Sequence, residues 1–508
     1  MKAVVMTWKT RLVAGAAGLA LLTPGLAVAQ EGTDARIKAL EEQLELLQGQ
    51  IADLKAQTAA SVSAVRSDAT STTVSLANGR PTFATSDGRF TASIRGVFQL
   101  DAAQYDQDAA GPLSSDFRRG SLGDATENDR ARDLSDGANF RRARLGIEGK
   151  AFGDFEYNFL YDFGGTGTEE AGRISAAWVQ YNGLPVKLRI GAFSPANGLE
   201  EAVSTNGSLF AERAAVAELV RGIGGGDGRT AASLAAGGDR WTALAAVTGN
   251  LIGVQTYDEQ TAALGRLTFV PLRRDSTLVH LGLNSTYVVN PAATGPDVAG
   301  TAATPIRLRE RPELRVDGAR LVDTGSIDAD GLIAIGAELG AQWKNLYLHT
   351  EYFDIQLDRK GPLADPEFNG WYAQAGWTIT GEPRRYQTSN GTFDAPQPAK
   401  PFDLKNGDWG AWELGLRYSY LDLNFLEGGG GSAPVAAGVR GGEQEIFTLG
   451  LNWYLNRVLR FQAAWQNVQV DRLSPGGAAF GAGVATPAAG AQVGQEFNIY
   501  SLRTQYAF

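Results

Sequence analysis

The chain has no cysteine, only two histidines and 19 prolines among its 508 residues. Without cysteine it can form no disulfide scaffold, thiolate zinc site or cysteine nucleophile. Two histidines leave little material for a metal centre, and we expect no catalytic residues, metal or cofactor. The formal charge of −10 argues against a nucleic-acid partner, because phosphate binding needs an excess of lysine and arginine. Glycine, in contrast, is abundant at 63 residues.

Residues 1–29 have the features of a secretory signal peptide. Three basic residues come first, the apolar stretch 12–22 follows, and Ala27-Val28-Ala29 offers a cleavage site before Gln30. A membrane anchor is the weaker alternative, since the apolar stretch is short and no other run of about 18 apolar residues follows it. Removing the three basic residues with the signal peptide changes the formal charge from −10 to −13.

Residues 30–57 predict a short coiled-coil helix. Apolar residues recur at alternating spacings of three and four: Ile37, Leu40, Leu44, Leu47, Ile51 and Leu54. Isoleucine at two of the three a positions with leucine at d favours two strands, although so short a seam does not fix the number. The alternative is one amphipathic helix packed on another element. The Ser/Thr/Ala-rich residues 58–88 are expected to form a linker.

From residue 89 onward the apolar period is two, which predicts β-strands. In residues 155–163 five aromatic residues alternate with Glu156, Asn158 and Asp162. A soluble sandwich alternates in the same way, but three features favour a transmembrane barrel. Aromatic residues begin or end the apolar faces, tight turns alternate with long polar loops, and the chain ends on a strand closing with Phe508.

An all-β, 16-stranded antiparallel transmembrane barrel is therefore expected over residues 89–508. The expected strands are 89–105, 139–151, 155–163, 172–182, 186–193, 228–237, 240–250, 258–270, 276–289, 331–343, 346–357, 368–380, 409–424, 444–455, 458–470 and 496–508. The segment 307–322 could form another strand, but an even number leaves it in a loop. Sixteen strands enclose an aqueous channel, so we expect a protein of the Gram-negative outer membrane, in contact with its lipid, with the helix in the periplasm.

Basic residues exceed acidic ones on the predicted inward faces. The basic residues are Arg95, Arg142, Arg144, Lys150, Lys187, Arg189, Arg266, Arg417, Arg460 and Arg503. The acidic ones are Asp101, Glu148, Glu156, Asp162, Glu351 and Glu413. A positive lining favours passage of anions, although the same charges could simply pair with one another in a wet lumen.

The connection at residues 194–227 is long and contains the helix-prone segment 211–218. If it folds into the lumen, it narrows the channel and Arg213 becomes a constriction charge. An ordinary surface loop explains the same residues equally well.

Several blocks of sequence resemble the phosphate-selective porins O and P. They are Phe140–Leu145, Leu188–Gly191, Gly198–Glu200, Phe210–Arg213, Gly376–Arg385, Gly410–Leu414 and Thr448–Tyr454, in the same order over residues 89–508. The resemblance implies a trimeric outer-membrane porin with an arginine-lined, loop-narrowed channel for phosphate. A coiled coil precedes the barrel in some relatives.

The family's constriction carries over only in part. Its inward arginine matches Arg142, its loop arginine matches Arg213, and its small hydroxyl residues match Ser204 and Thr205. The first-strand arginine falls at Val97, the partner acid at Ser175, and a loop lysine at Glu201. These departures remove charge-assisted contacts to an oxyanion. The candidate anion-binding residues are Arg142, Arg213, Arg144, Arg95, Lys187, Arg189, Ser204 and Thr205.

The sequence thus predicts an outer-membrane porin for passive uptake of phosphate or other small anions. A broad pore for small solutes without phosphate selectivity is the alternative. An outer-membrane barrel enzyme is a more distant one, because His280 and His349 have no serine and acid at a recognisable spacing. A tethering protein that uses the coiled coil would not need a charged lumen.

Overall fold

The computed structural model describes residues 31–69, 72–76, 79–112, 116–118, 133–164, 172–204, 206–254, 257–296, 301–476 and 487–508. The expected signal peptide lies outside these residues. Two compact units divide the chain, Met1–Ser71 and Thr72–Phe508.

The first unit contains one helix, α1 (Glu31–Ala69), of 39 residues. Its described heptad residues are exposed, among them Leu47 at 56% and Leu54 at 65%. No helix among the described residues has a stretch long and apolar enough to cross a membrane. The helix continues twelve residues beyond the predicted end at residue 57, where alanine, the best helix former, is frequent. The rest of the expected linker is also partly ordered, as strands β1 (Thr72–Ser75) and β2 (Thr82–Thr85).

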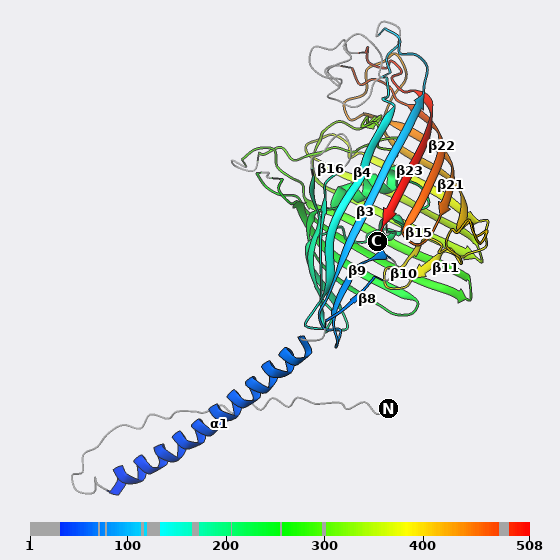
Figure 1. Cartoon of the computed structure of the whole chain (residues 1–508). Coiled ribbons are helices and arrows are strands. Elements are labelled where there is room, and N and C mark those ends of the chain that lie inside the picture. Colours follow the sequence, from blue (N-terminus) through cyan, green and yellow to red (C-terminus); the bar gives the residue numbers. More distant parts are fainter. Residues whose placement is uncertain are drawn as a thin grey trace. The chain divides into compact units, whose positions relative to one another are not determined.

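The second unit is a closed antiparallel barrel of 16 strands (Figure 1). Its strands are β3 (Thr91–Asp106), β4 (Gly137–Ala151), β5 (Phe155–Asp162), β6 (Arg173–Tyr181), β7 (Lys187–Ala192), β8 (Arg229–Gly237), β9 (Trp241–Leu251), β10 (Thr261–Arg274), β11 (Thr277–Asn290), β15 (Ile327–Trp343), β16 (Leu346–Arg359), β17 (Glu367–Thr378), β20 (Ala411–Phe425), β21 (Val439–Tyr454), β22 (Leu459–Asp471) and β23 (Glu496–Ala507). The last strand pairs with the first from Asn498↔Asp106 to Ala507↔Val97, which leaves no open edge in the wall. The predicted strand number is confirmed, and each predicted boundary lies within five residues of the observed one.

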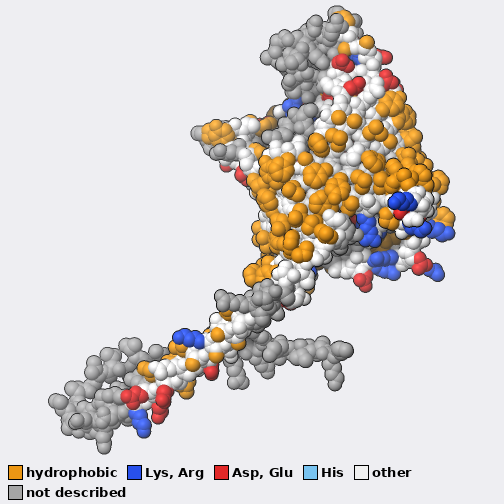
Figure 2. Space-filling model, in the orientation of Figure 1, with side chains coloured by type: hydrophobic (Ala, Val, Ile, Leu, Met, Phe, Trp, Pro, Cys, Tyr) orange, Lys and Arg blue, Asp and Glu red, His pale blue; other side chains and the backbone are white. Residues whose placement is uncertain are grey.

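Hydrophobic side chains cover the outer wall of the barrel. Outward residues such as Leu283, Leu449 and Leu502 are exposed, while their strand neighbours face the lumen. Figure 2 shows the hydrophobic side chains as a broad band across the wall, with charged side chains mainly toward its ends. A barrel with lipid around it and water inside it requires this pattern.

The two ends of the barrel differ. At the turn end, where the C-terminus lies, short connections such as residues 152–154 and 344–345 join neighbouring strands. The loop end carries the longer connections, including residues 193–228 and 291–326. The latter holds only the two-residue strands β12 (Pro305–Ile306), β13 (Arg309–Glu310) and β14 (Val322–Asp323), so its prediction as a loop is confirmed.

One connection at the turn end breaks the predicted alternation of short turns and long loops. Residues 379–410 join β17 to β20 and contain the small hairpin β18 (Arg385–Gln387) and β19 (Thr392–Asp394). We call this segment the turn-end insert. Its Phe393 is fully buried against loop residues Leu199 and Leu209, so the segment enters the lumen instead of closing a tight turn.

A row of glycines on the inner wall makes room for loop 193–228. Gly376, Gly415 and Gly450 lie opposite one another on β17, β20 and β21. A Cβ atom at Gly450 would lie 2.9 Å from the Phe210 ring, and one at Gly415 would lie 3.1 Å from Leu209. Larger side chains in this row would push the loop out of its seat.

We expect Gly450→Val to weaken the seating of loop 193–228. Overpacking a tight contact costs about 1–3 kcal/mol, so the temperature at which purified protein loses its folded electrophoretic mobility falls. Single-channel conductance rises as the loop moves from the lumen. A matched control is Gly429→Ala in the loop-end connection after β20, where a Cβ meets no atom within 4 Å. An unchanged melting temperature and conductance in Gly450→Val would contradict the proposed seating.

Candidate functional site

Loop 193–228 lies inside the barrel and fills part of the lumen. It contains the short helix α2 (Leu199–Ala202) and the amphipathic helix α3 (Ala215–Gly224). The apolar side of α3, including Val216 and Val220, packs into one buried cluster with wall residues such as Tyr372. Of the two sequence interpretations of this loop, the structure therefore agrees with the one that places it in the channel.

A second connection, residues 291–326, joins this cluster. Leu314, Val316 and Leu321 are buried with α3 and with the inward faces of β20 to β23. The two loops together fill the side of the lumen next to β16–β23. The two larger cavities that remain are lined in part by residues of β4–β10.

Inward arginines on the filled side hold the loops in place. Their guanidinium groups donate to loop carbonyl oxygens: Arg417 to Glu212 at 2.9 Å, Arg460 to Ser208 at 2.7 Å, and Arg503 to Ala211. Arg503 also forms a forked pair with Asp101 at 2.5 Å. Buried charges of this kind need both a counter-ion and hydrogen-bond acceptors. These arginines are therefore parts of the scaffold, although the sequence placed them on a channel lining.

The open side contains a cavity of about 370 Å³ in which arginine is the commonest lining residue. Its eleven arginines are Arg141, Arg142, Arg144, Arg173, Arg221, Arg229, Arg307, Arg309, Arg311, Arg315 and Arg320, against three carboxylates, Glu218, Asp227 and Glu310. We call it the arginine cavity. Such an excess of one charge inside low-dielectric walls attracts small anions. Five of these arginines belong to residues 307–320, which the sequence analysis left in an unassigned loop.

A β-bulge brings Arg141 and Arg142 into the lumen together. The register of β3 against β4 shifts between Gln99 and Leu100, so both arginines are buried, at 3% and 4% exposure. Arg142 donates to Gln99 at 2.7 Å and lies 4.0 Å from Glu212, while Arg141 forms a forked pair with Glu212. Arg141 was missed by strict alternation. The two consecutive arginines could have indicated a bulge. In a regular strand one of two neighbouring side chains faces lipid, which is unfavourable for an arginine.

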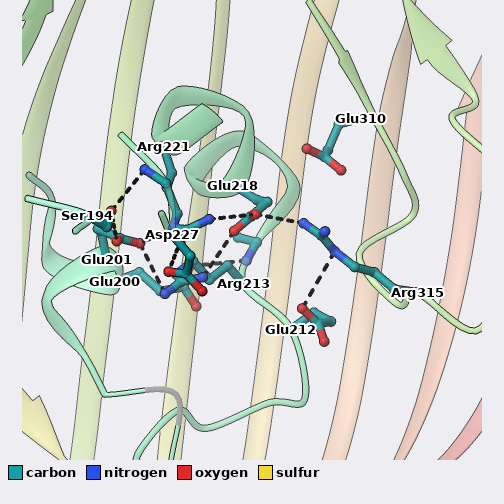
Figure 3. A network of polar contacts seen from close by, with 12 residues as sticks. Ser194, Glu200, Glu201, Glu212, Arg213, Glu218, Arg221, Asp227, Glu310 and Arg315 are labelled. Atoms are coloured by element: carbon teal, nitrogen blue, oxygen red, sulfur yellow. Dashed lines mark hydrogen bonds and ion pairs between the residues drawn. The ribbon is translucent and has the colours of Figure 1, made fainter. Parts of the chain in front are cut away.

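At the narrow part of the lumen, arginines and carboxylates form one network (Figure 3). Glu218 of α3 accepts hydrogen bonds from Arg213, Arg221 and Arg315 at 3.1, 3.2 and 2.6 Å. Asp227 pairs with both Arg144 and Arg221 at 2.5 Å. We call these residues, with Glu201 and Ser194, the constriction network.

Two positions at which the chain departs from the family that it resembles lie beside this network. The hydroxyl of Ser175 donates to Asp227 at 3.3 Å, so loop residue Asp227 brings a carboxylate to the place where the resemblance implied an acid. Val97 is buried opposite Arg144 in the wall and adds no charge there.

The network shifts the ionisation of its loop carboxylates. Burial alone would raise the pKa of Glu218, but Arg221, Arg315 and Arg213 hold it well below the ordinary value of 4.5. The pKa of Asp227 is likewise held well below its ordinary range, because the charges of Arg144 and Arg221 outweigh its burial. Glu200 differs, since burial raises its pKa to about 8 despite the attraction of Arg417. At neutral pH Glu218 and Asp227 are therefore charged and Glu200 is protonated.

A second cavity, of about 590 Å³, lies nearer the turn end. It is lined by Lys187, Arg189 and Arg266, by the acids Glu156 and Asp239, and by residues 388–390 of the turn-end insert. The guanidinium of Arg189 lies 4.1 Å from the Trp178 ring centre, and no carboxylate of the described residues is within ion-pair distance of it. We call this the lower cavity. Two of the predicted anion-binding residues, Lys187 and Arg189, line this lower cavity, whereas Arg142 and Arg144 line the arginine cavity.

The remaining predicted residues are dispersed. Arg213 belongs to the constriction network, whereas Arg95 pairs with Glu148 at 3.2 Å near the turn end, where Arg80 also reaches Glu148. Ser204 is exposed and borders a separate small pocket of about 210 Å³. Thr205 lies outside the described residues. The eight predicted residues therefore do not form one site.

Both histidines lie on wall strands and are fully buried. His280 meets Tyr386 at 2.8 Å and Glu338 at 3.1 Å, and His349 meets Tyr372 at 2.6 Å. No serine is among these partners. Within the part of the chain that the structure describes, no group of three acidic, histidine or cysteine side chains is placed to hold a metal ion.

Because its pKa is depressed, Glu218 stabilises the fold above its ordinary pKa. That contribution is lost as the pH falls from about 4.5 towards the lower folded value. We expect Glu218→Gln to lower the free energy of unfolding at pH 7 by about 3–5 kcal/mol, since it leaves three buried arginines short of a counter-charge. Thermal melts followed by circular dichroism at pH 7 and pH 3 measure both effects. Glu367→Gln, at an exposed outward position, is the control. A Glu218→Gln protein as stable as the parent at pH 7 would refute the assignment.

Comparisons with known proteins identify the family. Residues 109–508 match the model of the family described as "Phosphate-selective porin O and P". Porin O of Pseudomonas aeruginosa is 26% identical over 77% of this chain and 86% of its own length. An uncharacterized protein of Caulobacter vibrioides is 26% identical over 89% of each chain. Among solved structures, an anion-selective porin from Comamonas acidovorans covers 82% of this chain with all of its own, at 13% identity and a TM-score of 0.47. Since the family model matches most of its length, the chain belongs to the phosphate-selective porin O and P family and is an outer-membrane porin.

Proposed function

We propose that this porin is a passive, anion-preferring channel for phosphate or other small anions. The observation that carries the proposal is the arginine cavity, in which eleven arginines face three carboxylates. Arginine presents a planar fork of donors that fits phosphate and carboxylate oxygens. The description of the family, phosphate-selective porin O and P, agrees with this solute class.

Not every arginine of the lumen contributes to this preference. Arg417, Arg460 and Arg503 are engaged with loop carbonyls and carboxylates, so a count of inward charges overstates the positive lining. Arg142 is the stronger candidate, because its nearest carboxylate oxygen is 4.0 Å away and its Nε has no hydrogen-bond partner. A broad pore without phosphate selectivity remains the second candidate, favoured by the mixed charges of the lower cavity.

The outer wall and α1 give the surroundings of the channel. We propose that the hydrophobic band of Figure 2 contacts outer-membrane lipid and that three copies assemble. The exposed heptad seam of α1, at Leu44, Leu47 and Ile51, supports association between helices, with α1 in the periplasm. The residues at its a and d positions favour a two-stranded coiled coil, whereas the family resemblance implies three copies of the chain. The contacts that set the number of copies therefore belong to the barrel.

Reversal potentials across a planar bilayer under a KCl gradient test the anion preference. We expect the parent channel to favour chloride over potassium, and Arg142→Ala to reduce the permeability ratio by about two- to tenfold, as one positive charge leaves a weakly screened wall. Arg213→Ala is expected to act in the same direction. Lys400→Ala, at a position 74% exposed outside the cavities, serves as the control. Cation preference in the parent, or unchanged selectivity in both arginine variants, would be incompatible with the proposal.

Multi-angle light scattering of the detergent-purified, full-length protein tests the assembly. Three copies of a chain near 54 kDa are expected after correction for detergent. A mass of one or two copies would reject the trimer. Leu47→Asp in α1 is expected to leave three copies in place if barrel contacts set the number.

A further inference from the structure

Glu201 lies between two arginines at the constriction. Its Oε2 atom is 3.0 Å from Nη2 of Arg213 and 2.6 Å from Nε of Arg221, while Ser194 donates to its Oε1 atom at 2.5 Å. Figure 3 shows these residues grouped around one point below α3. Arg221 lines the arginine cavity, and Phe193 and Pro195, next to Ser194, line the lower cavity. The carboxylate therefore lies where the two cavities approach each other.

The contacts of Glu201 differ from those of the structural ion pairs. Glu212 and Glu413 each receive forked hydrogen bonds, from Arg141 at 2.7 and 3.0 Å and from Arg384 at 2.7 and 2.8 Å. Oε2 of Glu201 receives no hydrogen bond of acceptable geometry despite its short distances. Glu201 therefore receives one directional hydrogen bond, from Ser194 at its Oε1 atom, where the other two carboxylates receive a fork from an arginine.

The donors around Glu201 are incompletely used. The Nε atoms of Arg213 and Arg221 are buried and make no hydrogen bond of acceptable geometry among the described residues, although Nε of Arg221 lies 2.6 Å from Glu201. A buried donor without an acceptor is costly and marks a place where a further acceptor would be stabilised. Two such donors beside one carboxylate form an oxyanion-binding position that the chain itself satisfies only in part.

We propose that Glu201 is a built-in oxyanion that occupies the anion-binding position of the constriction, so that solute anions pass these arginines without being retained. The inference rests on the proposed anion channel and assigns the specificity of its narrowest part to one residue. A carboxylate and a phosphate present the same kind of oxygen acceptor to a guanidinium fork. With Glu201 present, the charges of Arg213 and Arg221 are balanced by Glu201, Glu218 and Asp227. Without it, a solute oxyanion supplies the missing acceptor.

The test removes the charge of Glu201 and keeps its shape. Calorimetric titration of inorganic phosphate into purified Glu201→Gln protein should give an affinity about tenfold higher than the parent, the worth of one charge-assisted contact. Inorganic phosphate should likewise inhibit chloride current through this variant at about tenfold lower concentration. Glu201→Ala, which opens more space, should show the same direction. Glu367→Gln removes an equal charge from the exposed outer wall and should match the parent.

Each outcome of the titration supports or overturns the role proposed for Glu201. Phosphate affinity that is unchanged in both Glu201 variants overturns the inference, and so does failure of both to reach the folded electrophoretic mobility, which would make Glu201 a structural counter-charge only. An increase in Glu367→Gln as well would assign the effect to net charge and also overturn it. Calorimetry does not depend on conduction, so a parent channel without anion preference rejects the proposed function separately.

Discussion

A guanidinium group inside this barrel must meet acceptors, and that requirement organises the lumen. Leaving a buried charge unpaired costs several kcal/mol, which no small packing gain offsets. On the side of β16–β23 the acceptors are loop carbonyls and carboxylates, as for Arg460 with Ser208 at 2.7 Å and Arg417 with Glu212 at 2.9 Å. The loops are thereby fixed to the wall. On the side of β4–β10 the arginine cavity gathers eleven arginines, and the Nε atom of Arg142 there has no hydrogen-bond partner among the described residues.

The filled part of the lumen also depends on small side chains in the wall. The row Gly376, Gly415 and Gly450 leaves space on the inner wall for Leu209 and Phe210. Glycine is costly in a strand, because it loses the most conformational entropy on folding. Here that cost is offset by the burial of large apolar loop residues. The glycine excess of the sequence thus has one local explanation in the contact between wall and loop.

Much of the fold could be predicted because a wall between lipid and water forces a period of two on every strand. The alternation around Phe155 and Phe447 set the faces, and most of the predicted inward charges are inward. Arg141 was not predicted, because a bulge changes the phase and no propensity marks it. The turn-end insert was not predicted either, since its anchoring residues Phe393 and Arg384 contact loop residues distant in sequence.

The candidate site was less predictable than the wall, because it too depends on contacts between residues distant in sequence. Glu212 and Asp227 lie in irregular parts of loop 193–228 and Glu218 in its helix α3, so what they face could not be assigned before the loop was seen packed in the lumen. Their pairing decides which arginines remain available. Arg144, a predicted anion-binding residue, is engaged with Asp162 and Asp227, whereas Arg142 is not engaged by any carboxylate closer than 4.0 Å.

The arrangement of the two cavities suits fast passage more than tight capture. Conduction requires that an anion be attracted strongly enough to enter and held weakly enough to leave. The arginine cavity supplies the attraction, because its field acts on any anion without fixing the geometry of one. At the constriction, Glu201, Glu218 and Asp227 neutralise Arg213 and Arg221, so the field does not deepen into a trap at the narrowest point. Beyond it, the lower cavity mixes Lys187 and Arg189 with Glu156 and Asp239, and the attraction is weaker still. The loop-end cavity has eleven arginines against three carboxylates, whereas the turn-end cavity has three basic residues against two acidic ones. The attraction of an anion therefore weakens from the loop end to the turn end.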